Sequence, residues 1–176
     1  MKSETIVFGG GCFWCTEAVF EMLKGVVKTE PGYAGGTTVN PDYESVCEGT
    51  TGHAEVLEIE YDPGTVPLDK LLEIFFKMHD PTLLNRQGAD VGTQYRSIVL
   101  YTNSDQKQTI EKAIKTAQKE YNKPIVTEIK KLEKFYPAEE YHKRYFDKNP
   151  FNPYCGIVIG PKIAKIKKEF AAYLKK

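Results

Sequence analysis

The residues best suited to chemistry lie in one run near the N-terminus, GGGCFWCTE at positions 9–17. An apolar stretch ends in three glycines, and Cys12 follows where a helix is expected to begin. Because a helix N-terminus favours an anion, we expect the pKa of the Cys12 thiol to fall. Free backbone N–H groups at the same place can hold an oxyanion. The pattern predicts a nucleophilic Cys12, and the alternative is a small buried core cysteine.

The same run contains a second thiol, so that Cys12 and Cys15 form a Cys-x-x-Cys pair. In a reducing compartment this spacing indicates dithiol redox chemistry. It also suits half of a zinc site, but the sequence has no second such pair. The remaining candidate ligands, Cys47, His53 and Cys155, are scattered along the chain. We therefore predict no metal site.

Two aromatic residues follow the candidate nucleophile, Phe13 and Trp14, and Trp14 is the only tryptophan of the chain. Sulfur and methyl groups contact aromatic rings favourably, so these rings suit a thioether or methyl group. The alternative is that both are ordinary core aromatics on the first turn of a helix.

A candidate acid stands at the start of the alternating segment AEVLEIEY, residues 54–61. The period of two puts Glu55 on the same face as Leu57, Ile59 and Tyr61. A carboxyl on an apolar face is disfavoured as an anion, so its pKa should rise and it can donate a proton near neutral pH. The alternative is a strand-end carboxylate that reaches solvent or caps a turn.

Three further residues carry weaker signals. Asp90 lies in the glycine-flanked loop GADVGTQYR, where an aspartate can bind a ligand or form a turn. Tyr43 and Tyr95 can supply phenolic hydrogen bonds, or be two of eleven ordinary tyrosines. His53, two residues before Glu55, either tunes the proton of that carboxyl or fills a turn.

These residues depend on the elements that hold them. Apolar patterning, turn residues and capping residues predict the boundaries. The predicted strands are 4–10, 26–32, 54–61, 95–101 and 126–132; the predicted helices are 13–24, one that begins at 68, 103–121, 138–146 and a tail helix from 161; residues 32–52 form a long loop.

The order through residue 101 is β-α-β-β-α-β, the ferredoxin-like arrangement. It predicts an α+β fold of the two-layer α/β sandwich type, with the later helices and the C-terminal segment wrapped around it. The 176 residues, 41% of them hydrophobic, suit a single domain spanning 1–176.

Composition narrows the class of protein further. Basic and acidic residues balance at 24 each, which is unlike the footprint of a nucleic-acid binder. No apolar run approaches the roughly 20 residues needed to span a bilayer, and the N-terminus does not read as a signal peptide. We expect a cytoplasmic protein, away from membranes and monomeric.

Taken together, these segments resemble the A-type peptide methionine sulfoxide reductases over nearly the whole chain. The matching pieces include GCFWCTE at 11–17, GYAGG at 32–36, PDYESVCEGTTGHAE at 41–55, RQGADVGTQYRS at 86–97 and NPYCG at 152–156. The resemblance implies a repair enzyme that reduces methionine S-sulfoxide, in oxidised proteins and free, without a cofactor.

The resemblance also implies a role for each candidate. Cys12 matches the nucleophile and Glu55 the acid that protonates the sulfoxide oxygen. Tyr43 and Tyr95 match phenols that hydrogen-bond that oxygen. The remaining matches are Phe13 and Trp14 to the pocket for the methyl group, and Asp90 to a carboxylate that positions the substrate.

The reaction implied by the resemblance leaves Cys12 as a sulfenic acid, which a second thiol converts to a disulfide for reduction by thioredoxin. Cys155 matches the resolving cysteine of many members and is our preference, with Cys15 and Cys47 as alternatives. Two other functions stay open on the residues alone. These are a thioredoxin-like disulfide oxidoreductase that uses Cys12 and Cys15, and a non-enzymatic redox-sensing or thioether-binding module.

Overall fold

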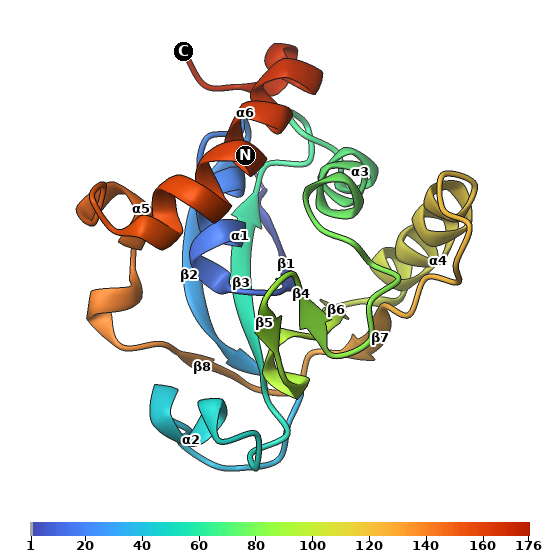
Figure 1. Ribbon diagram of the computed structural model, residues 1–176. Helices are drawn as coiled ribbons and strands as arrows, with labels where there is room; N and C mark the ends of the chain where they lie inside the picture. The colour runs from blue at the N-terminus through green and yellow to red at the C-terminus, as the bar shows by residue number, and fades with distance from the viewer. Residues whose placement is uncertain (1) are drawn as a thin grey trace.

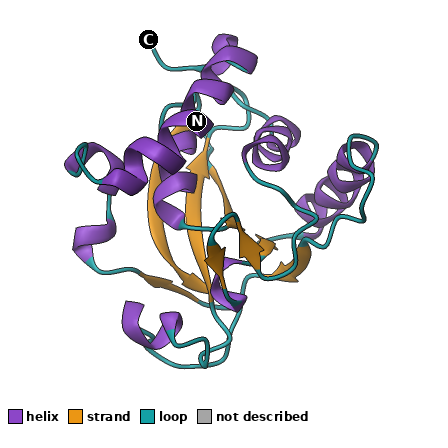
Figure 2. Cartoon of the chain, viewed as in Figure 1, coloured by secondary structure: helices purple, strands orange, loops and turns teal. Residues whose placement is uncertain are grey.

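The structure is a computed structural model that describes residues 2–176, and it has a mixed α/β fold (Figures 1 and 2). Its centre is a curled sheet with the strand order β7-β6-β1-β3-β2-β8. Every neighbouring pair is antiparallel except β6 and β7. The strands are β1 Glu4–Gly10, β2 Val26–Ala34, β3 Ala54–Tyr61, β6 Ser97–Tyr101, β7 Glu128–Lys131 and β8 Phe135–Pro137, and a separate hairpin joins β4 Arg86–Gln87 to β5 Asp90–Val91.

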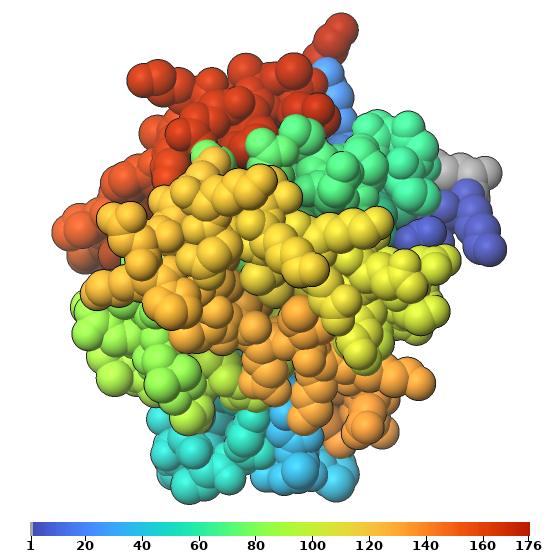
Figure 3. Space-filling model, turned by 90° about the vertical axis from the view of Figure 1, so that its right-hand side faces the viewer, coloured from blue at the N-terminus to red at the C-terminus, as the bar shows by residue number. Residues whose placement is uncertain are grey.

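Helix α6 packs against both α1 and α3, and α4 packs against α3 and β6. The α-helices are α1 Phe13–Phe20, α2 Tyr43–Cys47, α3 Leu68–Met78, α4 Ser104–Gln118, α5 Tyr145–Lys148 and α6 Gly160–Glu169. Short 3₁₀ turns are η1 Thr93–Tyr95, η2 Glu140–His142 and η4 Ala171–Tyr173, and η3 Cys155–Ile159 is a π-helical turn. Figure 3 shows α4 spread over one side of the molecule, with the C-terminal segment at one end and the α2 loop at the other.

The core follows from the alternation of side chains along the strands. One face of the sheet contributes Ile6, Phe8, Leu57, Ile59 and Val99 to a large cluster with α1, α3 and the C-terminal helix. The opposite face carries smaller apolar side chains, against which Leu132 and Phe135 pack. Helices α1, α3 and α6 therefore lie on the same face of the sheet.

The strand register brings three chain segments to one end of the sheet. In β1, Phe8 pairs with Leu57 of β3, and Gly10 pairs with Ser97 of β6. Because both pairings are antiparallel, the last residues of β1 lie beside the first residues of β3 and β6. Cys12, Glu55 and Tyr95 are consequently carried to the same end of the sheet.

Several predicted boundaries are wrong, and backbone contacts from distant segments explain the differences. The first helix ends at Phe20, four residues early, because Leu23 forms a bridge with Leu174 and Lys24 N–H donates to the Tyr173 carbonyl. The predicted helix 138–146 is split into η2 and α5, since Arg144 has a left-handed backbone at φ +52°.

Other differences fall in the loops. The predicted loop 32–52 contains the short helix α2, whose N-terminus is capped by Asp42. Tyr95 belongs to η1 and the strand begins at Ser97. Strand β8 and the β4–β5 hairpin have no counterpart in the prediction. Within the described part of the chain, no helix is both long and apolar enough to span a bilayer.

Candidate active site

Cys12 stands at the turn between β1 and α1. Gly11 precedes it with φ +99°, a left-handed conformation that favours glycine, and a Cβ there would lie 2.9 Å from Cβ of Gln87. Cys12 itself is extended and is the N-cap of α1, and its carbonyl accepts a hydrogen bond from Cys15 N–H at 3.1 Å. The sharp turn thus puts the Cys12 thiol at a helix N-terminus, with the residue only 9% exposed.

The predicted fall in the pKa of the Cys12 thiol is wrong for the free protein. Burial raises that pKa well above its usual range, and a hydrogen bond to Cys15 and the charge of Glu55 act in the same direction. The Cys12 thiol donates to Cys15, which lowers the pKa of Cys15 to about 7, and the ammonium of Lys162 contributes.

The predicted burial of Glu55 and its raised pKa are confirmed. The residue is 1% exposed, and burial raises the pKa of its carboxyl to about 8. One carboxyl oxygen, Oε1, accepts the Phe13 N–H at 3.3 Å. The other, Oε2, is buried with no hydrogen-bond partner among the described residues. At neutral pH the group is mainly a protonated acid beside the first turn of α1.

Tyr43 and Tyr95 approach Glu55 from two separate segments, α2 and η1. Burial raises the pKa of both phenols above the usual range, and the charge of Glu55 is the next cause for each. Both hydroxyls therefore remain protonated and available as hydrogen-bond donors. Cys12 also contributes to the shift at Tyr95, so this phenol lies near the thiol.

The two aromatic residues after Cys12 occupy a cluster of rings. Phe13 packs against Tyr33, with ring centroids 5.8 Å apart. Trp14 stacks flat on Tyr145 at 3.6 Å, and Tyr154 approaches its edge at 5.9 Å. The aromatic surface predicted from sequence is thus completed by two tyrosines of the C-terminal segment.

Asp90 in β5 faces that C-terminal segment as well. Its Oδ2 accepts a hydrogen bond of 2.6 Å from the Tyr154 hydroxyl, which also lies 3.8 Å from the sulfur of Cys15. A groove of about 550 Å³ has Cys12, Asp90, Tyr154 and Lys162 among its lining residues. The carboxylate of Asp90, which the sequence predicts to position the substrate, is therefore hydrogen-bonded to Tyr154 in this structure.

The four thiols are all free but lie in different surroundings. Cys155 is buried in η3, next to Tyr154, and burial raises its pKa, with a further contribution from Cys15. Cys47 is exposed at the end of α2. No group of three or more His, Cys, Asp or Glu side chains suited to a metal ion occurs within residues 2–176.

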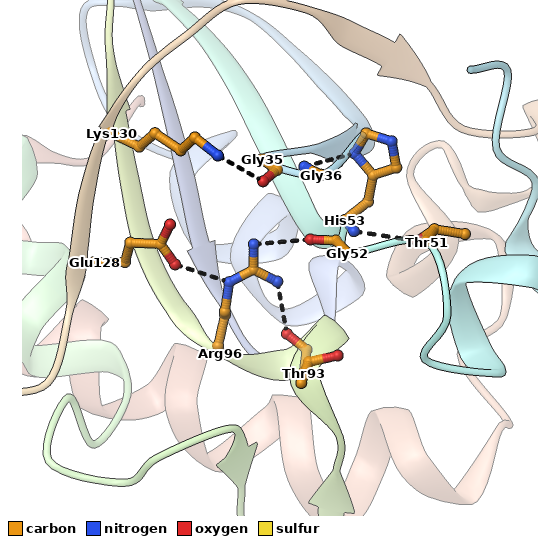
Figure 4. Close-up of polar contacts among 9 residues, drawn as sticks. All are labelled: Gly35, Gly36, Thr51, Gly52, His53, Thr93, Arg96, Glu128 and Lys130. Carbon is orange, nitrogen blue, oxygen red and sulfur yellow. Dashed lines mark hydrogen bonds and ion pairs between the residues drawn. The ribbon is translucent and has the colours of Figure 1, made fainter. Parts of the chain in front are cut away.

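His53 connects the segment before β3 to the segment that follows β2 (Figure 4). Its Nδ1 accepts the Gly36 N–H at 3.0 Å, and its Nε2 lies 2.7 Å from the Thr38 carbonyl. Both ring nitrogens are therefore used by the loop backbone. His53 holds the loop that carries Tyr43, and its ring makes no hydrogen bond to Glu55.

Arg96 has a positioning role that sequence reasoning missed. It donates to the carbonyls of Gly52 and Thr93 and pairs with Glu128 at 3.0 Å (Figure 4). It thereby joins the segment before Glu55 to the turn that holds Tyr95. Its place directly after Tyr95 was the only available signal, because its partners are distant in sequence.

Sequence reasoning also missed two glutamates, Glu17 and Glu139, that hydrogen-bond to the segments around the aromatic cluster. Glu17 is buried on α1 and accepts hydrogen bonds from the Arg144 N–H and the Thr29 hydroxyl. Glu139 accepts from the Tyr33 hydroxyl and the Tyr43 N–H. A glutamate in an otherwise apolar helix was the available signal for Glu17, and none pointed to Glu139.

Comparison with known proteins shows the family to which the chain is related. Residues 4–174 match the family described as peptide methionine sulfoxide reductase. A protein of Nautilia profundicola named peptide methionine sulfoxide reductase MsrA is 60% identical over 162 residues, covering 92% of this chain and 93% of that protein. The crystal structure of Mxr1 from Saccharomyces cerevisiae in reduced form is similar, with a TM-score of 0.83, 38% identity and coverage of 88% and 90%. Mxr1 in complex with Trx2 has a TM-score of 0.59, 26% identity and coverage of 82% and 85%.

Proposed function

The chain belongs to the peptide methionine sulfoxide reductase family and reduces methionine sulfoxide, and we propose that Cys12 and Glu55 carry out the chemical step. One observation carries this proposal. The Glu55 carboxyl is buried, has a pKa of about 8 and keeps one oxygen without a partner next to the helix that begins at Cys12. A buried acid beside a thiol matches the two requirements of sulfoxide reduction.

Those requirements follow from the charge distribution of a sulfoxide, whose sulfur is electrophilic and whose oxygen leaves only when protonated. Cys12 sulfur supplies an electron pair to the substrate sulfur while the Glu55 proton moves to the oxygen. In the net step the S–O bond of the substrate breaks, methionine leaves, and the oxygen ends on Cys12 as a sulfenic acid. The substrate sulfur gains two electrons and Cys12 loses two. The proton lost by the Cys12 thiol replaces the proton that Glu55 gave.

The surrounding side chains bind the substrate in this proposal. Phe13 and Trp14 receive the methyl group, because sulfur and methyl groups contact aromatic rings favourably. Tyr43 and Tyr95 donate hydrogen bonds to the sulfoxide oxygen, which their raised pKa values support. Asp90 positions the substrate after its hydrogen bond to Tyr154 opens.

For the second half of the reaction we propose that Cys15 and Cys155 act in turn. Cys15, whose pKa is about 7 and which hydrogen-bonds with Cys12, condenses with the sulfenic acid and releases water. The Cys155 thiolate then attacks the sulfur of Cys15, forms a disulfide with it and frees Cys12. This order differs from the sequence prediction, in which Cys155 itself reacts with the sulfenic acid: here Cys15 takes that step and Cys155 forms the second disulfide. Cys47 is exposed at the end of α2 and is our last choice.

The reductant we propose is thioredoxin, which supplies two thiols and two electrons to the final disulfide. The structure of the similar Mxr1 in complex with Trx2 supports this assignment. Oxidised proteins and free methionine S-sulfoxide are the proposed substrates, and the cytoplasm, where thiols stay reduced, is the proposed location.

The proposal extends to the organisation of the chain. Residues 1–176 act as one catalytic domain in this proposal, because one chain supplies every proposed site residue from Cys12 to Cys155, and the proposed state is a monomer. We assign a ferredoxin-like core to β1, α1, β2, β3, α3 and β6, and the antiparallel order β6-β1-β3-β2 supports it.

An assay with racemic methionine sulfoxide and dithiothreitol tests the function directly. We expect the S epimer to be consumed and the R epimer to remain, and loss of neither epimer would overturn the proposal. Consumption of disulfides alone would favour a thioredoxin-like oxidoreductase.

Peptide mapping after one equivalent of substrate tests the order of the thiols. In Cys155→Ser we expect a disulfide between Cys12 and Cys15 to accumulate. A sulfenic acid that persists on Cys12 in this variant would remove Cys15 from the reaction. A wild-type disulfide that joins Cys12 directly to Cys155 at the earliest time would contradict the proposed order.

A further inference from the structure

A buried histidine contacts the tryptophan at the proposed methyl pocket. His142 in η2 is fully buried, and its Nδ1 accepts the indole Nε1–H of Trp14 at 3.0 Å. The two residues are 128 positions apart in the chain. The sequence predicted a helix over this stretch and indicated no role for the histidine.

The hydrogen bond determines which nitrogen of His142 carries a proton. The indole N–H can only donate, so Nδ1 must be the unprotonated nitrogen. A neutral ring then has its proton on Nε2, which is buried with no hydrogen-bond partner within residues 2–176. A second proton, placed on Nδ1, would remove the acceptor and break the contact with Trp14.

The indole is held in two directions, and the two contacts differ in what they restrain. Tyr145 stacks on the indole face with an interplanar angle of 4°, which fixes the plane of the ring. A stacking contact allows the ring to slide and turn within its plane. The hydrogen bond to His142 acts at the ring edge and fixes the remaining orientation.

We propose that His142 is a positioning residue for the reductase reaction, which holds the Trp14 indole in the orientation that binds the methyl group of the sulfoxide. This inference rests on the proposed function, in which Trp14 contacts that methyl group. His142 performs this role only as the neutral Nε2–H tautomer. The oriented indole stabilises the bound substrate and the transition state equally, so His142 contributes to substrate binding more than to the chemical step.

The surroundings keep the imidazole neutral. Burial lowers the pKa of His142, and the charge of Lys148 acts in the same direction, whereas Glu139 opposes them. The packing partners from α1 are the uncharged Phe13 and Trp14. The titratable and charged groups that face the ring from all elements are Tyr43 of α2, Glu139 and Tyr141 at η2, and Lys148 of α5.

The test compares two substitutions that differ in the acceptor. His142→Phe keeps a ring of similar shape without an acceptor, and His142→Asn places an amide oxygen near the position of Nδ1. Trp14 is the only tryptophan, so a ¹⁵N-labelled protein gives one indole N–H resonance that reports the contact. Tyr141→Phe, in the same turn, is the matched control.

We expect His142→Phe to move the indole resonance to higher field, because the indole N–H loses its acceptor. KM should rise about tenfold with kcat little changed, which is the size of effect expected when one hydrogen bond that supports substrate binding is lost. His142→Asn should restore the resonance and most of the KM, and Tyr141→Phe should alter neither. In the wild type, the resonance should shift when acid protonates His142, and this shift should be absent in His142→Asn.

An unchanged indole resonance in folded His142→Phe would overturn the inference. So would a His142→Asn protein with the same KM as His142→Phe, because restoring the acceptor would then have no effect. If neither variant folds, the wild-type spectrum decides, and an indole N–H resonance near neutral pH at the chemical shift of an indole without an acceptor would contradict the role. Failure of the wild type to reduce methionine sulfoxide would defeat the proposed function instead and leave the resonance measurements valid.

Discussion

Glu55→Gln should lower activity and, above neutral pH, raise stability. The substitution keeps the size of the side chain and removes its acidic proton. General acid catalysis contributes roughly 10²–10⁴-fold, so we expect kcat/KM to fall by about this factor. This loss corresponds to about 3–5 kcal/mol of transition-state stabilisation. In the wild type, activity should fall as the pH rises through about 8, where Glu55 loses its proton.

The effect of Glu55→Gln on stability follows from the raised pKa of the Glu55 carboxyl. Its pKa is about 8 in the folded protein against 4.5 for the reference carboxyl. Between these values the folded state binds the proton and the unfolded state does not, so stability decreases as the pH rises. The interval of about 3.5 pH units, at 1.36 kcal/mol each, corresponds to about 5 kcal/mol, and about 3 kcal/mol of it is already lost at pH 7.

Gln does not titrate, but it introduces an amide N–H₂ where Oε2 has no partner, which costs about 1–3 kcal/mol at every pH. The wild type should therefore be the more stable protein near pH 5, and Glu55→Gln the more stable one near pH 8.5. Urea unfolding under dithiothreitol at several pH values measures this crossing. Glu60→Gln, on the opposite face of the same strand, is the control for activity and should keep the wild-type kcat/KM.

Two results would refute the reasoning. One is a Glu55→Gln enzyme with kcat/KM within about tenfold of the wild type, because Glu55 would then not be the acid. The other is a stability difference between the two proteins that stays constant from pH 5 to 8.5, because the carboxyl would then not be protonated in the folded state.

Three other substitutions test how the site is held. Gly11→Ala should destabilise the fold by at least about 1 kcal/mol, measured by urea unfolding, and abolish turnover, since φ is +99° and a Cβ would lie 2.9 Å from Gln87; wild-type stability would contradict this. Arg96→Lys should cost about 2–3 kcal/mol in the same measurement, because one ammonium cannot replace the fork that joins two carbonyls and a carboxylate. Tyr154→Phe removes the 2.6 Å hydrogen bond to Asp90 and should lower KM for methionine sulfoxide severalfold, since substrate no longer displaces it; a higher KM would show that the tyrosine itself binds substrate.

The sequence by itself determined strands β1 and β3 and the face of β3 on which Glu55 lies. Strands β1 and β3 have the predicted bounds because continuous or alternating apolar residues favour one conformation locally. The predicted burial of Glu55 is confirmed for the same reason, since side chains alternate between the faces of a strand. The position of Cys12 at a helix start follows equally from local signals, namely the glycines before it and the apolar pattern after it.

Only the tertiary structure decided the protonation of the thiols and the partners of the aromatic residues. The helix N-terminus alone predicts a low pKa at Cys12, but burial and the neighbouring Cys15 and Glu55 reverse the direction. The contacts of Trp14 with Tyr145 and His142 join segments about 130 residues apart. Desolvation and long-range contacts depend on which segments the fold brings together, and no local pattern in the chain encodes them.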